Sequence, residues 1–359
     1  MKLEKITSII TDYVANGSFS SLRENAKYVD KTNAYARVIR LTDENNNYSE
    51  ERAIYVNKES YNFLSKSKLE PGDIIITNVG AYLGTVFQCP KLSIHMTLGP
   101  NAVLVKPNPN IVFNKYLYYL LSSKYGHNKL VSLVSGSAMP KFNKTDLKNM
   151  DILIHKKSIQ QHIVNTIGTI EDLVEKKREI ITKLTDFSTK LYENYLFGEG
   201  LVEKLGNCCS IKTGKLDANA ANQNGLYPFF TCSRNPLKIN KYAFDCNAII
   251  ISGNGEIEVK YYEGKFNAYQ RTYILEPKKH LYLFLKQCEK IINNLRNNSQ
   301  GSVIKFITKS MLEKISIIEN EQSDEYDNKI KTIYNLIAKL NKEIENLSKI
   351  KIKLLQKYF

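Results

Sequence analysis

Three residues in the second half of the sequence have the order that a metal-dependent nuclease uses. Asp245 is followed by Glu258 and Lys260, and two carboxylates with a lysine can hold Mg²⁺ and polarise a phosphate. The spacing is loose, however, and the first half has Leu83 and Thr85 in place of Glu258 and Lys260. A Mg²⁺-dependent nuclease is therefore kept as an alternative and not as the leading interpretation.

Other catalytic motifs are absent from the sequence. It has no Pro-Pro pair, which an adenine methyltransferase uses when it holds a flipped base, and no P-loop for ATP-driven translocation. Its five histidines are scattered and its six cysteines form no C-x-x-C motif, so neither a metal cluster nor a disulfide framework is indicated. We therefore expect no catalytic activity, no metal and no cofactor in this chain.

The charge balance favours a polyanionic partner. Lys and Arg number 51 against 36 Asp and Glu, which gives a formal net charge of +15 and makes nucleic acid the first candidate. A Lys-rich composition typical of an AT-rich genome is the alternative explanation. The sequence has no apolar run of the ~20 residues that cross a bilayer and no apolar leader at its start, so we expect a cytoplasmic protein without a membrane partner.

The sequence contains an internal repeat, which decides the architecture. The buried-strand pattern of residues 73–80 returns at 247–255, and in both places an isoleucine run ends in a Gly/Asn turn. The Gly-Ser segment at 135–142 likewise returns at 299–306. The second half is shorter, mainly in the first part of its globular region, where loops are expected to vary.

Two long helices form the strongest pattern. Apolar residues alternate spacings of four and three, the a/d rhythm of a coiled coil, and the second series follows the first at a constant offset of 163 residues from Ile167 onward. Two helices that cover separate cores are the alternative. The two series are Ile163, Ile167, Ile170, Val174, Lys177, Ile181, Leu184, Ser188, Leu191 and Tyr195, and then Ile330, Ile333, Ile337, Leu340, Ile344, Leu347, Lys351, Leu354 and Tyr358.

Six segments carry a resemblance to a known family. The sequence is similar to the specificity subunit of type I restriction-modification systems, in which two target recognition domains alternate with two long helices. In the second half the resemblance covers Gly214-Lys215 and residues 227–233, 248–255 and 266–271, and in the first half residues 35–41 and 71–75. No short tandem repeat is visible in the first helix, so the spacing of the DNA target stays open.

The resemblance implies a mixed α+β fold, with two α/β recognition domains in pseudo-repeat and two helices that form an antiparallel coiled coil. The expected parts are recognition domain 1 (1–158), the first spacer helix (159–198), recognition domain 2 (199–322) and the second spacer helix (323–359). It also implies a non-catalytic subunit that binds a bipartite site in double-stranded DNA. Two methyltransferase subunits would dock on it for adenine methylation, and motor-nuclease subunits would join for cleavage. A coiled-coil scaffold that binds other proteins is the second alternative.

Candidate DNA-contacting residues are those with basic, amide or aromatic side chains near the Gly/Asn turns, where loops can vary without harming the core. Lys141 and its equivalent Lys305 are the leading phosphate contacts because each follows a Gly/Ser turn. The full set is Arg37, Arg40, Asn78, Gly80, Tyr82, Lys141, Lys212, Lys215, Arg234, Asn254, Gly255, Gln270, Arg271 and Lys305.

Overall fold

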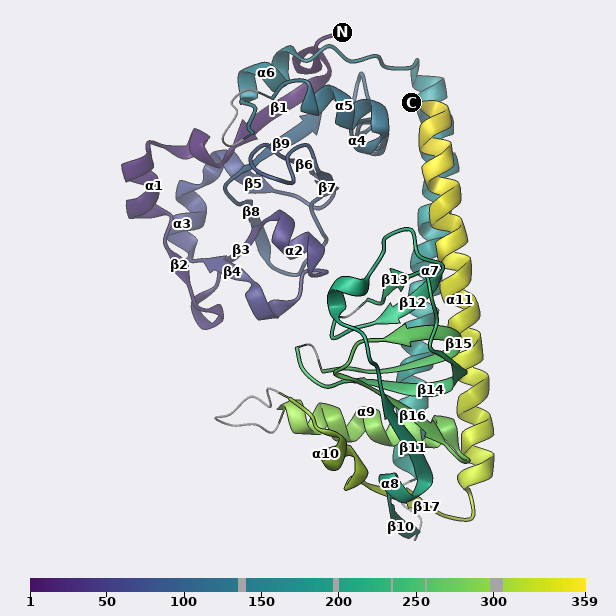
Figure 1. Cartoon of the computed structure of the whole chain (residues 1–359). Helices are drawn as coiled ribbons and strands as arrows, with labels where there is room; N and C mark the ends of the chain where they lie inside the picture. Colours follow the sequence, from purple (N-terminus) through teal and green to yellow (C-terminus); the bar gives the residue numbers. More distant parts are fainter. Residues whose placement is uncertain (135–139, 196–199, 234, 256, 298–305) are drawn as a thin grey trace. The chain divides into compact units, whose positions relative to one another are not determined.

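The computed structural model describes residues 1–134, 140–195, 200–233, 235–255, 257–297 and 306–359. Within these ranges the chain forms two compact units (Figure 1). The first unit contains residues 1–175 and 345–359, and the second contains residues 176–344. Each unit thus has one globular region and a part of each long helix. Every helix in these ranges is too short or too polar to span a lipid bilayer.

A four-stranded antiparallel sheet, in the order β1-β9-β6-β7, forms the centre of the first unit. Ile74 and Ile76 of β6 contribute to one hydrophobic cluster and Ile75 to another, so this strand is buried on both faces, as its uninterrupted isoleucine run predicts. The strands are Thr7–Asp12 (β1), Ile74–Thr77 (β6), Val86–Gln88 (β7) and Ala102–Pro107 (β9), and helices Asn114–Ser122 (α4), Lys124–Val131 (α5) and Lys144–Asn149 (α6) contribute to the first cluster.

A second, five-stranded sheet of the first unit has the order β2-β4-β3-β8-β5. Ile39 of β3 and Leu98 of β8 share a hydrophobic cluster with Ile75 and Leu104 of the first sheet, so the two sheets pack on one another. The strands are Tyr28–Val29 (β2), Ala36–Ile39 (β3), Ile54–Val56 (β4), Lys68–Leu69 (β5) and His95–Leu98 (β8). Helix Phe19–Asn25 (α1) precedes β2, Leu41–Asn45 (α2) connects β3 to β4, and Lys58–Phe63 (α3) connects β4 to β5.

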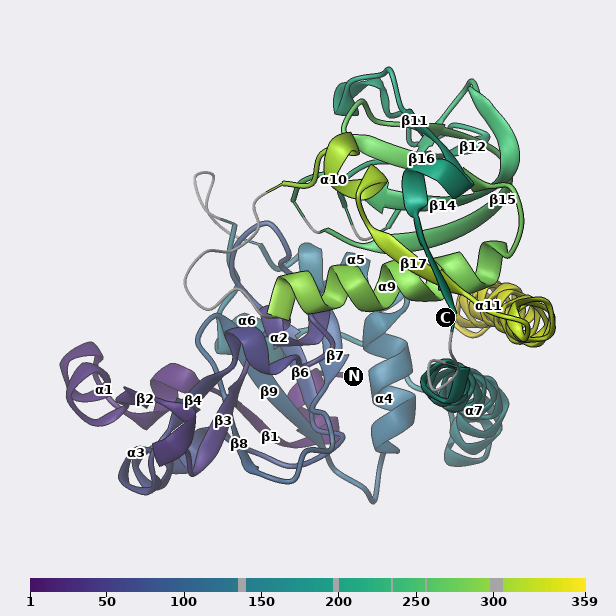
Figure 2. The ribbon, with the colours of Figure 1, turned by 90° about the horizontal axis from the view of Figure 1, so that it is seen from below.

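The second unit is built on a six-stranded sheet in the order β11-β16-β14-β15-β12-β13. Ile249 and Ile251 of β14 join one cluster and Ala248 and Ile250 another, and α9 lies across one face of the sheet (Figure 2). The elements are Leu201–Lys204 (β10), Leu205–Cys208 (α8), Cys209–Thr213 (β11), Tyr227–Phe230 (β12), Leu237–Ile239 (β13), Phe244–Ser252 (β14), Val259–Ala268 (β15), Thr272–Pro277 (β16), Leu281–Asn297 (α9), Lys309–Glu313 (α10) and Ser316–Glu319 (β17).

The repeat seen in the sequence is a repeat of strand order. Strands β1-β9-β6-β7 of the first unit correspond to β11-β16-β14-β15 of the second, and all of these pairs are antiparallel. The units also begin alike, because the amide of Leu3 donates to the carbonyl of Met150 (3.0 Å) and that of Leu205 to Ile315 (2.8 Å). The predicted mixed α+β fold of two repeated domains is confirmed.

The two long helices are α7 (Lys157–Tyr195) and α11 (Ser323–Tyr358). Inside the first unit, Glu171 of α7 contacts Lys351 of α11, and His162 contacts Tyr358. Inside the second unit, Lys177 contacts Glu343, and Tyr195 contacts Ser323. As the residue number on α7 increases, the residue number of its partner on α11 decreases, so the helices are antiparallel.

The polar residues of the predicted seam have partners in the structure. Lys177 pairs with Glu343 (2.6 Å), Lys351 pairs with Glu171 (2.8 Å), and the hydroxyl of Ser188 donates to the carbonyl of Thr185 (2.7 Å). The apolar seam residues Ile163, Ile167, Ile330 and Ile333 are buried. Each helix thus contributes one lysine and one glutamate to the pairing.

Candidate nucleic-acid interface

In the first unit, the loop after β6 packs against residues 140–142. The amide of Gly80 donates to the carbonyl of Pro140 (3.0 Å), Val79 and Lys141 form an isolated antiparallel bridge, and the amide of Phe142 donates to Asn78 (3.2 Å). Residues 60 or more positions apart are thereby joined. The structure brings together four of the predicted residues, Asn78, Gly80, Tyr82 and Lys141.

The side chains of this loop suit an interface. Tyr82 is 67% exposed and Lys141 is exposed. Gly80 has a φ of +89°, and a Cβ placed on it would meet no atom within 4 Å, so the backbone here is bare on its outer side. The side-chain amide of Asn78 donates to Phe142 (3.2 Å), while its buried Oδ1 has no hydrogen-bond partner among the described residues. This loop can offer a ring, a cation and accessible backbone to a ligand.

In the second unit, the loop after β14 makes the corresponding contacts. The amide of Ile307 donates to the carbonyl of Gly253 (2.7 Å), and Asn254 forms an antiparallel bridge with Phe306. The amide of Gly253 donates to the carbonyl of Arg271 (2.8 Å). Gly255 has a φ of +65° and is exposed. Asn254, Gly255 and Arg271 are therefore close together.

The remaining described candidates of the second unit differ in what they can offer. Gln270 and Arg271 are exposed, and the amide of Gln270 donates to Leu216 (2.9 Å), which places exposed Lys215 in the adjoining loop. Lys212 instead pairs with Glu276 across β11 and β16 (2.7 Å), and this hydrogen bond raises the pKa of Lys212. Because its charge is already partly neutralised, Lys212 is the weaker phosphate contact.

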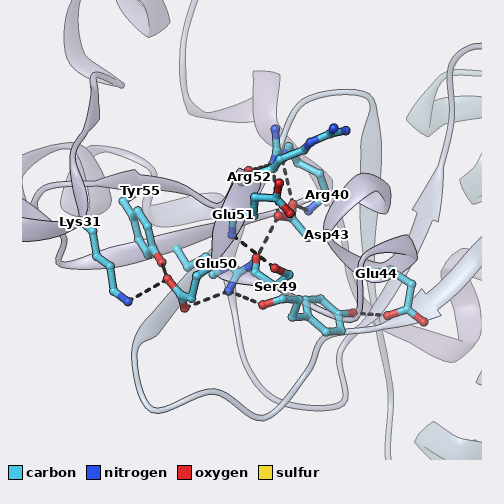
Figure 3. A network of polar contacts seen from close by, with 11 residues as sticks. Lys31, Arg40, Asp43, Glu44, Ser49, Glu50, Glu51, Arg52 and Tyr55 are labelled. Carbon is cyan, nitrogen blue, oxygen red and sulfur yellow. Dashed lines mark hydrogen bonds and ion pairs between the residues drawn. The ribbon is translucent and has the colours of Figure 1, made fainter. Parts of the chain in front are cut away.

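The prediction that Arg37 contacts DNA is wrong, because its side chain is inside the protein. Arg37 is 1% exposed, and its guanidinium donates to the carbonyls of Tyr48 (2.8 Å) and Ser49 (2.9 Å). Its position between apolar residues of a buried strand was the signal for this. Arg40 lies at the edge of the same network (Figure 3), where Asp43 accepts from its Nε at 2.8 Å.

Two candidates, Arg234 and Lys305, lie outside the described residues.

The Mg²⁺ arrangement does not assemble. In the antiparallel pair of β14 and β15, Asp245 lies opposite Lys265, and the carbonyl of Glu258 accepts from the amide of Ser252. The two carboxylate residues are thus seven positions apart along β14, about 20 Å, too far to share one ion. Among the described residues, no group of three or more His, Cys, Asp or Glu could hold a metal ion.

Comparison with known proteins identifies a family. The family model for the type I restriction modification DNA specificity domain matches the chain twice, over residues 10–186 and 201–354. The type I restriction enzyme EcoDI specificity subunit of Escherichia coli is 45% identical over 118 residues, which are 32% of this chain and 26% of that protein. This match thus spans about a quarter of the relative's length.

Two further relatives match over more of the chain. The type I restriction enzyme MjaIX specificity subunit of Methanocaldococcus jannaschii is 22% identical over 298 residues, 68% of each protein. The crystal structure of a type I restriction-modification S subunit from M. genitalium covers 100% of this chain and 95% of that one, with a TM-score of 0.58 and 17% identity. This last likeness concerns the fold alone.

Proposed function

Because the chain belongs to the type I restriction modification DNA specificity family, we propose that it reads a bipartite target in double-stranded DNA and directs partner subunits to it. Each unit reads one half of the target, and the chain itself is not an enzyme. The observation that carries this proposal is the repeated loop. In each unit, the turn after the central isoleucine strand pairs with a segment that is distant in the sequence. Val79 pairs with Lys141 in the first unit, and Asn254 pairs with Phe306 in the second. Two like surfaces suit two half-sites.

The chemistry of these surfaces supports a duplex ligand. Exposed Lys141, Lys215 and Arg271 can neutralise phosphates, and exposed Gln270 can bond base edges. The net charge of +15 has the same sign. A DNA-binding complex should therefore lose affinity steeply with salt. A flat salt response with duplex DNA would instead favour a protein-binding scaffold.

The test of the bipartite target is methylation mapping in a host that carries this chain and its methyltransferase partner. We assign recognition domains to residues 1–158 and 199–322, with spacer helices at 159–198 and 323–359. Exchange of residues 1–158 for those of a relative should change one half of the methylated sequence and leave the other half and the spacer unchanged. A change in both halves would contradict independent reading.

We also assign the distance between the half-sites to the helix pair. Helix α11 supplies Leu354 and Tyr358 to the core of the first unit and Tyr326 and Ile330 to the core of the second. To lengthen the helix pair, both helices must therefore be extended together. One heptad added after Glu175 and one after Ile344 keep both seams in phase and add about 10 Å. The methylated site should gain about three base pairs of spacer. An active variant whose methylated site keeps the original spacer would show that the helices do not set the distance between the half-sites.

The partners are two methyltransferase subunits, which dock on the helices, and motor-nuclease subunits, which join them for cleavage in the cytoplasm. Leu173 and Phe187 of α7 are 42% and 53% exposed, and Leu336 and Ile350, at the same offset of 163 residues on α11, are 44% and 47% exposed. Apolar side chains repeated on both helices suit two copies of one partner.

This docking is tested by the mass of the purified complex. Leu173→Lys should remove one methyltransferase copy and Leu173→Lys with Leu336→Lys both copies, because a charge would be buried in each contact. Leu153→Lys, at an equally apolar residue that is 75% exposed outside both helices, is the matched control and should keep both copies. Full occupancy of the double variant would place the docking surface elsewhere.

A further inference from the structure

The two units differ most in one segment. Residues 13–73 of the first unit lie between β1 and β6 and supply α1, α2, α3 and four strands of the second sheet. The corresponding segment of the second unit, residues 214–243, is much shorter and supplies β12 and β13. A scaffold that is alike in both units cannot by itself distinguish two half-sites. Residues 13–73 thus supply much of the first-unit surface that the second unit lacks.

Within that segment, one loop is held by a network of charges around the buried guanidinium of Arg37. The guanidinium of Arg37 donates to the carbonyls of Tyr48 and Ser49 and lies 3.5 Å from Asp43 and from Glu50. Figure 3 shows Asp43 paired with Arg40 on one side and Glu50 with Lys31 and Tyr55 on the other. Tyr55 and Lys31 both bond the carboxylate of Glu50 and lower its pKa. The loop is therefore tied at both of its ends.

Two residues at the tip of the loop have a backbone conformation that is unfavourable for their residue types. Asn47 and Tyr48 have φ values of +47° and +55°, in the left-handed region that non-glycine residues seldom occupy. The tyrosine that follows the tip is anchored, since its hydroxyl bonds Glu44 and the carbonyl of Gln88. Burial and the bond to Glu44 raise the pKa of Tyr48, so this phenol stays a donor. Such backbone strain persists where surrounding contacts fix it, often at ligand sites.

Three consecutive asparagines stand at the end of α2 and the start of the turn that follows it. Asn45, Asn46 and Asn47 are exposed, and no hydrogen bond of their side-chain amides is found among the described residues. An asparagine amide can donate to N7 and accept from N6 of adenine, which is its preferred bidentate partner in the major groove. Exposed Arg52, whose carbonyl accepts from Arg40 (2.8 Å), belongs to the same network and offers a cation for the DNA backbone.

We propose that Asn45, Asn46 and Asn47 form an adenine-reading loop of the first unit and that buried Arg37 is its positioning residue. This inference rests on the proposed function and gives one half-site a chemical identity. The network keeps the loop rigid before DNA arrives, so little ordering is needed on binding. The loop reads the major groove, and Gly80 and Lys141 contribute backbone and phosphate contacts.

The test uses the full chain assembled with its methyltransferase partner, bound to duplexes that carry the methylated target with one base pair replaced at a time. The variant Asn46→Ala with Asn47→Gly removes two amides, and glycine keeps the left-handed backbone. Affinity for the native target should fall about tenfold to a hundredfold, with discrimination lost at an adenine of one half-site. Asn110→Ala, an exposed asparagine on another loop of the same unit, should bind like the wild type.

Each outcome has one meaning. Unchanged discrimination by the double variant overturns the loop assignment, and discrimination lost at a base other than adenine overturns its chemistry. A wild-type complex that shows no sequence preference at all overturns the proposed function instead.

Arg37 has its own readout. Arg37→Lys keeps the charge but loses the fork that bonds both carbonyls, so it should relax the same adenine position and add little to the asparagine double variant. An equal loss at every position, together with lower affinity for unrelated DNA, would reduce Arg37 to a general structural role.

Discussion

The two units join their globular regions to the helix pair with the same scaffold but opposite polar contacts. In the first unit, Glu171 of α7 accepts hydrogen bonds from Tyr119 (2.7 Å) and Lys115 (2.8 Å) of α4. In the second, the position 163 residues later is Tyr334 of α11, which donates to Glu289 of α9 (2.8 Å). The helix supplies the acceptor in one unit and the donor in the other. A repeated fold has thus kept its packing while its polar contacts changed.

The largest expected effect tests whether the units are separate in stability. Leu117 of α4 and Leu283 of α9 are both fully buried, each in the main cluster of its own unit. Leu117→Ala and Leu283→Ala should each lower the free energy of unfolding by about 3 kcal/mol. Hydrogen exchange should accelerate in residues 1–175 for the first variant and in residues 176–344 for the second. Equal acceleration in both units would show that they unfold together.

The second prediction concerns acid, which should act on the first unit through Glu171. Burial alone would raise the pKa of Glu171, but hydrogen bonds from Lys115 and Lys351 outweigh it and hold the pKa below its usual value. A depressed carboxyl pKa stabilises the fold above the unfolded pKa of about 4.3, and this stabilisation is lost as the pH falls through the folded value.

Glu171→Gln should therefore lower the free energy of unfolding by about 1.5 kcal/mol at pH 7. The difference from the wild type should shrink below about pH 4, as measured by denaturant unfolding at several pH values. A difference that stays constant down to pH 3 would separate Glu171 from the acid response.

A smaller effect compares the two tyrosines directly. Tyr119→Phe leaves Glu171 with Lys115 and Lys351, whereas Tyr334→Phe leaves Glu289 with Lys286 (3.0 Å) among its described partners. We expect Tyr334→Phe to cost about 1 kcal/mol and Tyr119→Phe about half of that. Thermal unfolding of the two variants measures this order, and the reverse order would mean that the donor matters more in the first unit.

The smallest effect belongs to the seam. Lys177 and Glu343 are 23% and 39% exposed, so water screens their ion pair. Lys177→Gln should cost about 0.5 kcal/mol and lose its effect at high salt. Denaturant titrations at low and high salt test this, and a salt-independent loss would indicate that the stem of Lys177 contributes by packing.

The sequence was sufficient for the parts of the fold that depend on periodicity. The buried-strand pattern at residues 73–80 and the shared seam from Ile167 to Tyr358 follow from patterns of spacing, and the structure has both of them. Periodicity is local and survives in a single sequence.

The parts that could not be predicted depend on long-range pairing. The buried side chain of Arg37 is ion-paired with Asp43 and Glu50 across a turn, and this pairing is visible only in the fold. The tip at Asn45–Asn47 likewise gains its meaning from the left-handed backbone and from the anchoring of Tyr48. Residue type suggested a surface contact for Arg37 because burial of a paired charge leaves little trace in composition.

The seam also determines which helices will pair when many copies of the chain are made together. Lys177 meets Glu343, and Glu171 meets Lys351. In a pairing of α7 with a second α7, the 163-residue offset would place Ile180 where Glu343 lies and Ser188 where Lys351 lies, and both ion pairs would be lost. The seam therefore favours the unlike helix over its own kind. Since every chain carries one helix of each kind, a single molecule can form both ion pairs within itself. Pairing of like helices from two molecules would form neither ion pair.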